Sequence, residues 1–136
     1  MHKRIPLRLL MMAPAIMGAA WILFCSAHYA QAADTGGDAK HGETVFNKRC
    51  GGCHALDIDK DGPRLRGVFG RKAGTGGSFK YSEALKKSGV IWDEQSLDKW
   101  LTDPDKFIAD NDMDFHLPKP DERADVIAYL KTLTAK

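Results

Sequence analysis

Apolar residues recur at helical spacing in the last part of the chain. The members of this apolar face are Ala124, Ile127, Ala128, Leu130 and Leu133. The run Pro120-Asp121-Glu122 precedes them, and it is a typical helix opening with proline in the first turn and carboxylates near the N-terminus. The pattern predicts a helix from Pro120 to the C-terminus.

A second stretch of this kind follows Asp93, a candidate N-cap. The apolar positions that recur at i, i+3 and i+4 are Leu97, Trp100 and Leu101. We expect this helix to end near Asp103, because Pro104 disfavours the helical conformation of the residue before it.

Two further helices follow from weaker patterns. Asp38 is a candidate N-cap for a helix over residues 38–49. Gly42 within it costs about 1 kcal/mol relative to Ala, which indicates that another element packs closely there. Tyr81 to Lys87 forms a short predicted helix with Ser82 as its cap.

The remaining segments favour loops. Glycines punctuate residues 62–77 too densely for a long regular element, and residues 107–119 read as coil. No repeat and no second domain is found, so the sequence predicts an all-α domain with long loops. Ordered loops of this length in a small domain need something to wrap around.

The run Cys50-Gly51-Gly52-Cys53-His54 offers that centre. Two thiols three positions apart, followed by an imidazole, match the attachment sequence for c-type haem, in which both cysteines form thioethers and the histidine ligates iron. The two glycines allow the backbone to approach the porphyrin. We predict one covalent haem c, bound through Cys50 and Cys53, with His54 as an iron ligand.

Other interpretations of the same five residues remain. A structural zinc site usually needs a second pair of ligands, and no second pair of cysteines exists in the sequence. A thioredoxin-like redox pair requires a βαβ setting, and a lone disulfide leaves His54 without a role.

The first 32 residues are predicted to be an export signal. A basic start precedes an almost wholly apolar run over residues 9–24, and Ala30-Gln31-Ala32 is a small-residue cleavage pattern. Cleavage before Ala33 leaves residues 33–136 as one domain in the periplasm. The alternative is an uncleaved inner-membrane anchor over residues 9–27.

Removal of the signal changes the charge balance. Lys3, Arg4 and Arg8 are lost, so the basic residues fall from 20 to 17 against 18 acidic ones, and the formal net charge becomes −1. This balance argues against nucleic acid as a partner, because no net positive field remains.

The chain resembles the class I cytochromes c of the mitochondrial and α-proteobacterial soluble type, over essentially all of residues 33–136. The matching stretches are Gly42 with Phe46, the haem motif, Gly62-Pro63, residues 67–72, 79–82 and 92–101, and the run from Glu122 to Lys131. The resemblance implies a small all-α fold of three to five helices whose long loops wrap around one covalent haem.

The resemblance also implies residue roles. Pro63 packs on His54 and orients its imidazole, while Arg71, Tyr81 and Trp92 bind around the inner haem propionate. Gly42 and Phe46 meet Tyr129 where the first and last helices cross.

The chain departs from the family pattern at several positions. The loop between His54 and Pro63 is three residues shorter than in the mitochondrial proteins, and Leu85 stands where Asn is usual. Trp100 stands at the haem where the family usually has Tyr, so no phenolic hydroxyl can donate to the methionine sulfur there. The basic residues left from the family's lysine ring are Arg49, Lys60, Lys72, Lys86, Lys87 and Lys106, and the acidic residues that crowd the sixth-ligand loop are Asp110, Asp112 and Asp114.

Met113 is the predicted sixth iron ligand. The other methionines all lie in the expected signal, and Met113 precedes the last helix, where the family places its axial methionine. Its sulfur raises the reduction potential relative to a second imidazole. His116 is the rival ligand.

These predictions describe an electron carrier rather than an enzyme. We expect a monomer that shuttles electrons from a dehydrogenase or bc1-type complex to a terminal oxidase or reductase, and that meets membranes only through those complexes or an uncleaved anchor. The alternatives are a membrane-anchored cytochrome c or oxidase-associated subunit, and a haem enzyme or gas sensor that uses His116 as a distal acid or base.

Overall fold

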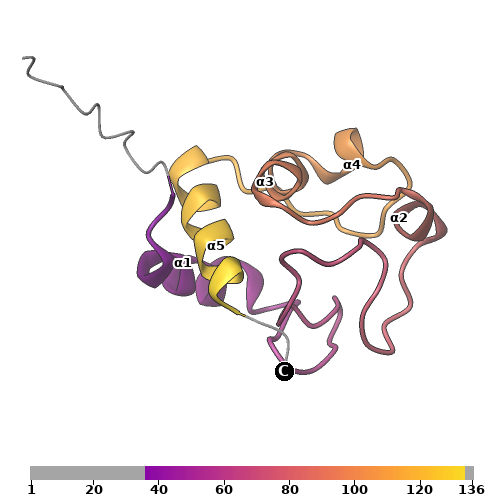
Figure 1. Cartoon of the computed structure of the whole chain (residues 1–136), viewed down its shortest axis with the longest axis horizontal. Helices are drawn as coiled ribbons and strands as arrows, with labels where there is room; N and C mark the ends of the chain where they lie inside the picture. The colour runs from indigo at the N-terminus through magenta and orange to yellow at the C-terminus, as the bar shows by residue number, and fades with distance from the viewer. Residues whose placement is uncertain (1–35, 134–136) are drawn as a thin grey trace, which may run out of the picture. The chain divides into compact units, whose positions relative to one another are not determined.

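The fold is known from a computed structural model that describes residues 36–133. Its helices are α1 (Ala39–Val45), η1 (Phe46–Cys50), α2 (Glu83–Lys87), α3 (Glu94–Thr102), α4 (Pro104–Phe107) and α5 (Pro120–Thr132) (Figure 1). Extended pairing within this part of the chain is limited to one isolated bridge between Lys72 and Ile91. The expected all-α fold with long loops is therefore confirmed.

The first predicted helix divides into two kinds of helix. The Asp38 carboxylate accepts hydrogen bonds from the amides of Lys40 and His41, and so caps α1 as expected. From Phe46 the chain continues as the π-helix η1, in which the Gly51 amide reaches back five residues to the Phe46 carbonyl at 2.9 Å. This wider turn ends at Cys50, directly at the haem motif.

α1 and α5 cross in close contact (Figure 1). A Cβ atom on Gly42 would overlap the Asp125 carbonyl group and would lie 3.0 Å from the Tyr129 Cβ. The Phe46 and Tyr129 rings pack beside this contact with centroids 5.6 Å apart. The prediction that another element packs closely on Gly42 is confirmed, since only a residue without a side chain permits this approach.

The Asp125 carboxylate ties the start of α1 to α5. One oxygen accepts a hydrogen bond from the Asp38 amide at 2.6 Å, and the other lies 2.6 Å from His41 Nδ1. The hydrogen bond with Asp125 raises the pKa of His41 above its usual value. His41 is therefore an ion-pair partner whose charge depends on pH.

The middle helices follow their predicted capping signals. Ser82 caps α2 through the Leu85 amide, and Asp93 forms a reciprocal capping box with Ser96 at the start of α3. α3 ends at Thr102, close to the predicted position. α4 was not predicted, and it lies between the expected end of α3 and the expected coil: Asp103 caps it, and Pro104, which ends α3, occupies its first turn.

α5 contains a buried cation that the apolar pattern does not reveal. Val126, Ile127 and Leu130 are buried with Tyr129, so the buried face is broader than predicted. Arg123 is only 8% exposed, and its guanidinium donates to the Asp98 carboxylate and to the carbonyls of Leu117 and Pro118. Arg123 thus connects α5 to α3 and to the segment that precedes α5.

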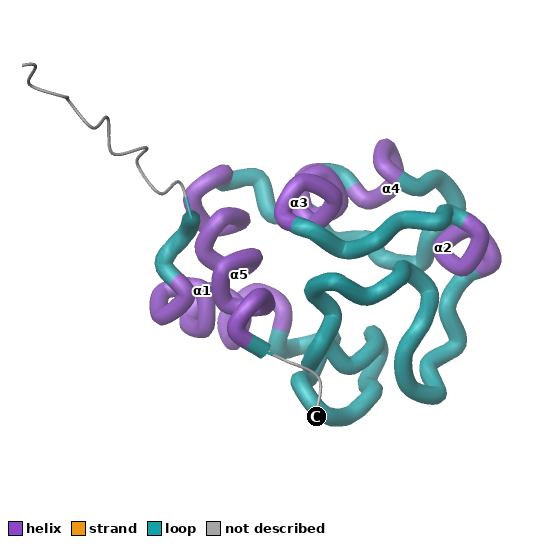
Figure 2. Tube along the Cα trace, in the orientation of Figure 1, coloured by secondary structure: helices purple, strands orange, loops and turns teal. Residues whose placement is uncertain are grey.

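Loops cover much of the side away from α1 and α5 (Figure 2). Residues 51–82 contain no helix, and the glycines that adopt positive φ there are Gly67, Gly70, Gly74, Gly76 and Gly77. The loop expected from the glycine density is confirmed. None of the helices within residues 36–133 is long and apolar enough to cross a membrane. The expected export signal, residues 1–32, lies outside the described residues.

Candidate functional site

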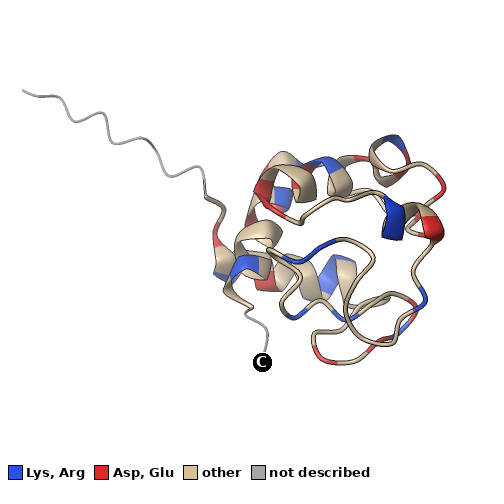
Figure 3. Cartoon of the chain, turned by 45° about the vertical axis from the view of Figure 1, so that its right-hand side comes forward, with Lys and Arg blue, Asp and Glu red and all other residues tan. Residues whose placement is uncertain are grey.

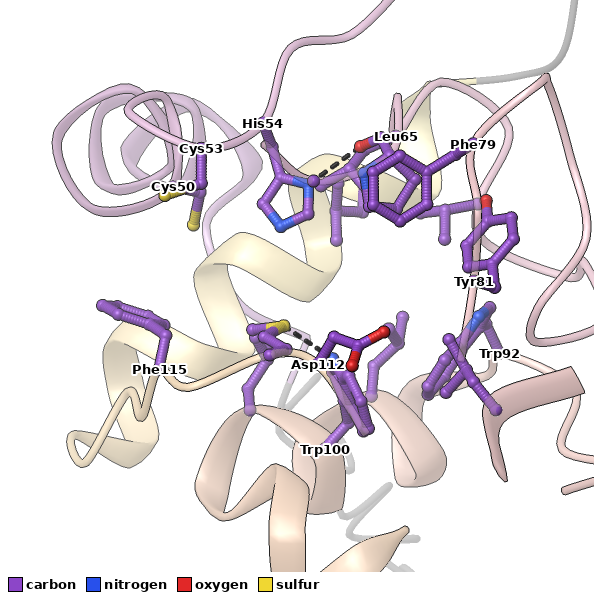
Figure 4. Close-up of a pocket in the computed structure, with 18 of the residues that line it drawn as sticks. Cys50, Cys53, His54, Leu65, Phe79, Tyr81, Trp92, Trp100, Asp112 and Phe115 are labelled. Atoms are coloured by element: carbon purple, nitrogen blue, oxygen red, sulfur yellow. Dashed lines mark hydrogen bonds between the residues drawn. The ribbon is translucent and has the colours of Figure 1, made fainter. Parts of the chain in front are cut away.

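One cavity of about 340 Å³ lies between the haem motif, the glycine-rich loop, α3 and the segment before α5. All the residues expected to contact the haem line it, namely Cys50, Cys53, His54, Pro63, Arg71, Tyr81, Trp92, Trp100 and Met113. Several come from positions far apart in the sequence (Figure 4). The volume falls in the range of ligand pockets, and most of the lining is apolar.

A tight turn presents the two thiols. The amides of Cys53 and His54 both donate to the Cys50 carbonyl, at 3.1 and 2.9 Å. Cys50 is half-buried, Cys53 is exposed, and no disulfide joins the two. Burial against the apolar cavity, with a smaller contribution from Cys53, raises the pKa of the Cys50 thiol to about 11.

His54 is oriented by the Gly62-Pro63 turn. Its Nδ1 lies 2.8 Å from the Pro63 carbonyl oxygen, which can only accept, so Nδ1 carries the proton and Nε2 keeps a free lone pair. A Cβ on Gly62 would overlap the His54 ring, so the backbone here packs directly on the imidazole. Burial lowers the pKa of His54, and the ammonium group of Lys60 acts in the same direction.

Met113 reaches the same cavity on the side of Trp100. The indole Nε1 of Trp100 donates to the Met113 sulfur at 3.1 Å (Figure 4), and the Met113 amide donates to the Asn111 side-chain oxygen at 2.7 Å. In the figure His54 lies across the pocket from Trp100. Trp100 in place of the family's usual Tyr therefore removes a phenolic hydroxyl, but its indole N–H still donates a hydrogen bond to the Met113 sulfur.

His116 occupies a different environment. Its side chain is exposed, its Nδ1 lies 3.3 Å from the Thr102 carbonyl oxygen, and it does not line the cavity. Met113 and His116 are three residues apart, yet only the thioether faces the space between the haem motif and α3. The geometry therefore favours Met113 over His116 as the ligand.

Arg71 brings a half-buried cation to the cavity wall. Its terminal nitrogens donate to the carbonyls of Arg66 and Arg64, at 3.3 and 3.4 Å, while its Nε is buried with no hydrogen-bond partner in the described part of the chain. A Cβ on Gly76 would lie 2.8 Å from the Arg71 Cζ, so the glycine leaves room for the guanidinium. A buried donor without a partner is costly, and an anionic group in the cavity would satisfy it.

Two more predicted residues complete this wall. The Tyr81 hydroxyl donates to the carbonyls of Thr75 and Gly76, at 3.0 and 3.2 Å. Trp92 is buried and its ring packs against Trp100 with centroids 5.4 Å apart. The cavity is thus bounded by aromatic rings on the side that also carries Arg71.

The set of groups fits a haem. One apolar cavity is lined by two thiols at the spacing for thioether attachment, an imidazole with a free Nε2 and a thioether. A guanidinium whose buried Nε lacks a hydrogen-bond partner among the described residues lines it as well. Within residues 36–133 no three His, Cys, Asp or Glu side chains are placed to hold a metal ion directly. These features define the class of small all-helical proteins built around a c-type haem.

Comparisons with known proteins specify the family. The cytochrome c family model matches residues 39–134. Cytochrome c of Guizotia abyssinica is 46% identical over 103 residues, which cover 73% of this chain and 93% of the relative, and that of Sesamum indicum is 47% identical over the same shares. Cytochrome cH from Methylobacterium extorquens superposes with a TM-score of 0.68 at 45% identity, covering 71% of this chain and 99% of that chain. The chain belongs to the cytochrome c family.

Family membership establishes the cofactor and the general activity. Cytochromes c bind one covalent c-type haem through cysteines, and Cys50 and Cys53 have the required spacing. They are electron-transfer proteins rather than enzymes, and they interact with redox partners. The resemblance, the fold class and the haem predicted from the sequence are confirmed.

Sequence reasoning missed functional contributions from two residues. Arg123 binds the carbonyls of Leu117 and Pro118, a few residues after Met113, and gives no sequence signal because its partners are distant or in the backbone. Asn111 holds the Met113 amide, and its position two residues before Met113 is a signal for such an asparagine turn.

Proposed function

We propose that the chain is a periplasmic one-electron carrier whose haem iron is ligated by His54 and Met113. The observation that carries this proposal is that an imidazole nitrogen and a thioether sulfur line the same apolar cavity as both cysteines. Each ligand is held from behind, His54 by the Pro63 carbonyl and Met113 by the Trp100 indole. Two restrained ligands suit electron transfer, because they need not move when the oxidation state changes.

Each ligand has a separate chemical task. Bound haem supplies a one-electron ferric–ferrous couple. His54 offers Nε2 because Nδ1 is committed to Pro63, and its lowered pKa keeps the ring neutral and able to ligate. The Met113 thioether is a soft ligand that favours the reduced iron and so raises the potential relative to a second imidazole.

The residues of the wall that carries Arg71 would hold a haem propionate. The buried Arg71 Nε has a proton to donate and no acceptor among the described residues, so a carboxylate there would satisfy it. Tyr81 and Trp92 line the same wall. Together they would hold one carboxylate inside the protein rather than in solvent, and so would orient the haem.

The exposed edge of the site is the route to redox partners. Cys53 is exposed where it lines the cavity, and Phe115, Asp112 and Asp114 line the same cavity. A partner that docks there approaches the haem without disturbing either ligand. The donor is a dehydrogenase or bc1-type complex and the acceptor is a terminal oxidase or reductase, with the chain acting as a monomer.

The periplasmic location rests on the export signal over residues 1–32 and a mature chain that begins at Ala33. Its support is the basic, apolar and Ala-Gln-Ala order of the sequence. A solved bacterial relative, cytochrome cH from Methylobacterium extorquens, aligns with this chain over 99% of its own length at 45% identity.

Absorption spectra of the purified protein, oxidised and reduced, test the ligation. His and Met ligands give a low-spin spectrum with a weak near-infrared sulfur-to-iron band in the oxidised form. A high-spin spectrum, or a low-spin spectrum without that band, would contradict the proposed ligand pair.

Intact mass tests the location: a chain that begins at Ala33 in the periplasmic fraction is expected, whereas a retained Met1 in the membrane fraction supports the anchored alternative.

A further inference from the structure

The ammonium group of Lys60 points back at the haem-attachment turn, residues 50–54. Its Nζ donates to the Gly51 carbonyl at 2.7 Å and to the Gly52 carbonyl at 2.6 Å. By the family resemblance, Lys60 is one of the basic residues left from the family's lysine ring. The structure gives two of its three donor hydrogens acceptors within the protein.

The neighbours of Lys60 bind the rest of the same turn. The Gly62 amide donates to the Cys53 carbonyl at 2.9 Å, and the Pro63 carbonyl accepts from His54. The Lys60 amide donates to the Gly62 carbonyl at 2.9 Å, which closes the segment on itself. Residues 60–63, called here the clip, thus contact four successive residues of the attachment turn.

On the clip side of these contacts, Lys60 provides the only side chain. The Gly62 amide and the Pro63 carbonyl are backbone groups, so their bonds depend on the path of the chain rather than on side-chain chemistry. Gly51 and Gly52 follow the last turn of η1, where carbonyl groups carry partial negative charge. A compact ammonium with rotatable donors suits two adjacent carbonyls, and such charge-assisted bonds are stronger than neutral ones.

We propose that Lys60 is a positioning residue that holds the haem-attachment turn against Gly62 and Pro63, rather than a docking residue for redox partners. The inference rests on the proposed role of His54 as an iron ligand, because the clip holds the turn and the His54 ring together. The shortened loop between His54 and Pro63 brings the lysine back over the turn.

A second effect follows from the charge of Lys60. Its ammonium lies beside the residues that carry the haem and makes two hydrogen bonds there, so its position is fixed. A fixed positive charge favours the less positive, reduced state of a nearby redox centre. Lys60 therefore raises the reduction potential in addition to ordering the turn.

The test compares Lys60→Met with Lys48→Met in the haem-containing protein. Lys48 lies on η1, is exposed, and has no ion pair with any residue of the described range, so its removal changes the charge equally without breaking a contact. Three quantities are measured: the exchange rates of the Cys53, His54 and Gly62 amides, the haem methyl shifts of the oxidised protein, and the reduction potential.

Lys60→Met should speed exchange at these three amides by about tenfold, since it removes two bonds to a charged donor. It should also shift the haem methyl resonances and lower the potential. Lys60→Arg, which keeps charge and donors, should restore most of each change. Lys48→Met should leave the exchange rates and the methyl shifts at their wild-type values.

Equal exchange rates and methyl shifts in Lys60→Met and Lys48→Met would overturn the proposal. So would a Lys60→Met protein whose only change is slower reaction with an anionic reagent, because that result describes a docking charge. If Lys60→Met yields no haem-containing protein, Lys60→Gln takes its place and should also exchange faster than wild type. The near-infrared band of the wild-type protein tests the His54 and Met113 ligation separately, so failure of that ligation is distinguishable from failure of the role of Lys60.

Discussion

The Trp100 indole nitrogen donates a hydrogen bond of 3.1 Å to the sulfur of Met113. The family usually provides a phenolic hydroxyl at this position, and this chain provides an N–H group instead. Trp100 is 8% exposed and packs against Trp92, so its ring has little freedom to turn away. The sulfur is therefore restrained by a donor whose own position is determined by the core.

Replacing Trp100 with Phe should lower the reduction potential. A hydrogen bond to the sulfur withdraws electron density from the thioether, which favours reduced iron, and Phe keeps the ring but removes the donor. We expect a shift on the order of tens of millivolts, small beside the roughly 0.8 V that axial ligands span. Cyclic voltammetry measures it. Trp100→Tyr, which retains a donor, should remain closer to wild type, and equal potentials in wild type and Trp100→Phe would show that the bond has no influence.

Replacing Met113 with Ala should abolish the near-infrared sulfur-to-iron band. The potential should also fall by on the order of 0.1 V or more, because the soft ligand is lost. His116→Ala is the matched control, since His116 is exposed and outside the cavity lining. If His116→Ala lost the near-infrared band and lowered the reduction potential while Met113→Ala kept both at their wild-type values, the ligand would be His116.

Replacing both Cys50 and Cys53 with Ala should leave no haem on the chain after denaturing electrophoresis. The domain should also lose its cooperative thermal transition, because residues 51–82 contain no helix and depend on the group they surround. Haem staining and circular dichroism measure the two effects. A stained band from the double variant would refute covalent attachment at these cysteines.

The ion pair between His41 and Asp125 should make stability depend on pH. The folded pKa of His41 is raised, so its stabilising contribution is complete below the unfolded value of about 6.5 and is lost as pH rises through the folded pKa. The difference in unfolding free energy between wild type and His41→Gln should therefore shrink from pH 5 to pH 8. Denaturant titrations at several pH values measure it, and a difference that grows over this interval would contradict the assigned direction.

Charges at the exposed edge should steer small redox reagents. Asp112 and Asp114 are exposed, line the cavity and have no ion pair within residues 36–133, whereas acidic and basic residues elsewhere are interspersed along helices and loops (Figure 3). Replacing both with Asn should speed oxidation by anionic hexacyanoferrate(III) severalfold at about 0.01 M salt, where the Debye length is about 30 Å. At about 1 M salt, where it is about 3 Å, the rates should converge.

The control for this experiment is the double variant Glu43→Gln with Asp121→Asn, whose positions on α1 and α5 lie outside the cavity lining. It removes the same two negative charges from the protein without altering the edge where the haem is exposed. Stopped-flow rates for the Asp112 and Asp114 variant that match those of this control would mean that only net charge, not its placement, controls the reaction.

Local signals predicted most of the fold. The caps Asp38, Ser82 and Asp93 and the helix opening at Pro120 placed four helices, because capping depends on groups within a few residues. α4 was missed because Pro104 is both an end signal for one helix and a start signal for the next. The π-helix η1 leaves no local signal in the apolar pattern, since it differs from an α-helix by one residue in its hydrogen bonding.

The haem-attachment residues could be predicted because covalent chemistry fixes their spacing in the sequence. Contacts that depend on the packing of distant segments could not be predicted in this way. Cys50, Cys53 and His54 are adjacent, so their common role follows from the sequence. The Arg123 interaction with Asp98 and the Lys60 interaction with two carbonyls depend on how separate segments pack. A charged residue in the sequence is expected on the surface unless its partner is known.

The contact of Gly42 with Asp125 and Tyr129 joins the beginning and the end of the folded domain. Protein synthesis delivers α1 well before α5, so α1 has no packing partner until almost the whole chain has been made. Pairing between such distant segments also forms slowly compared with local contacts. The thiols of Cys50 and Cys53 consequently stay accessible in the growing chain, and the domain closes only when its final helix arrives.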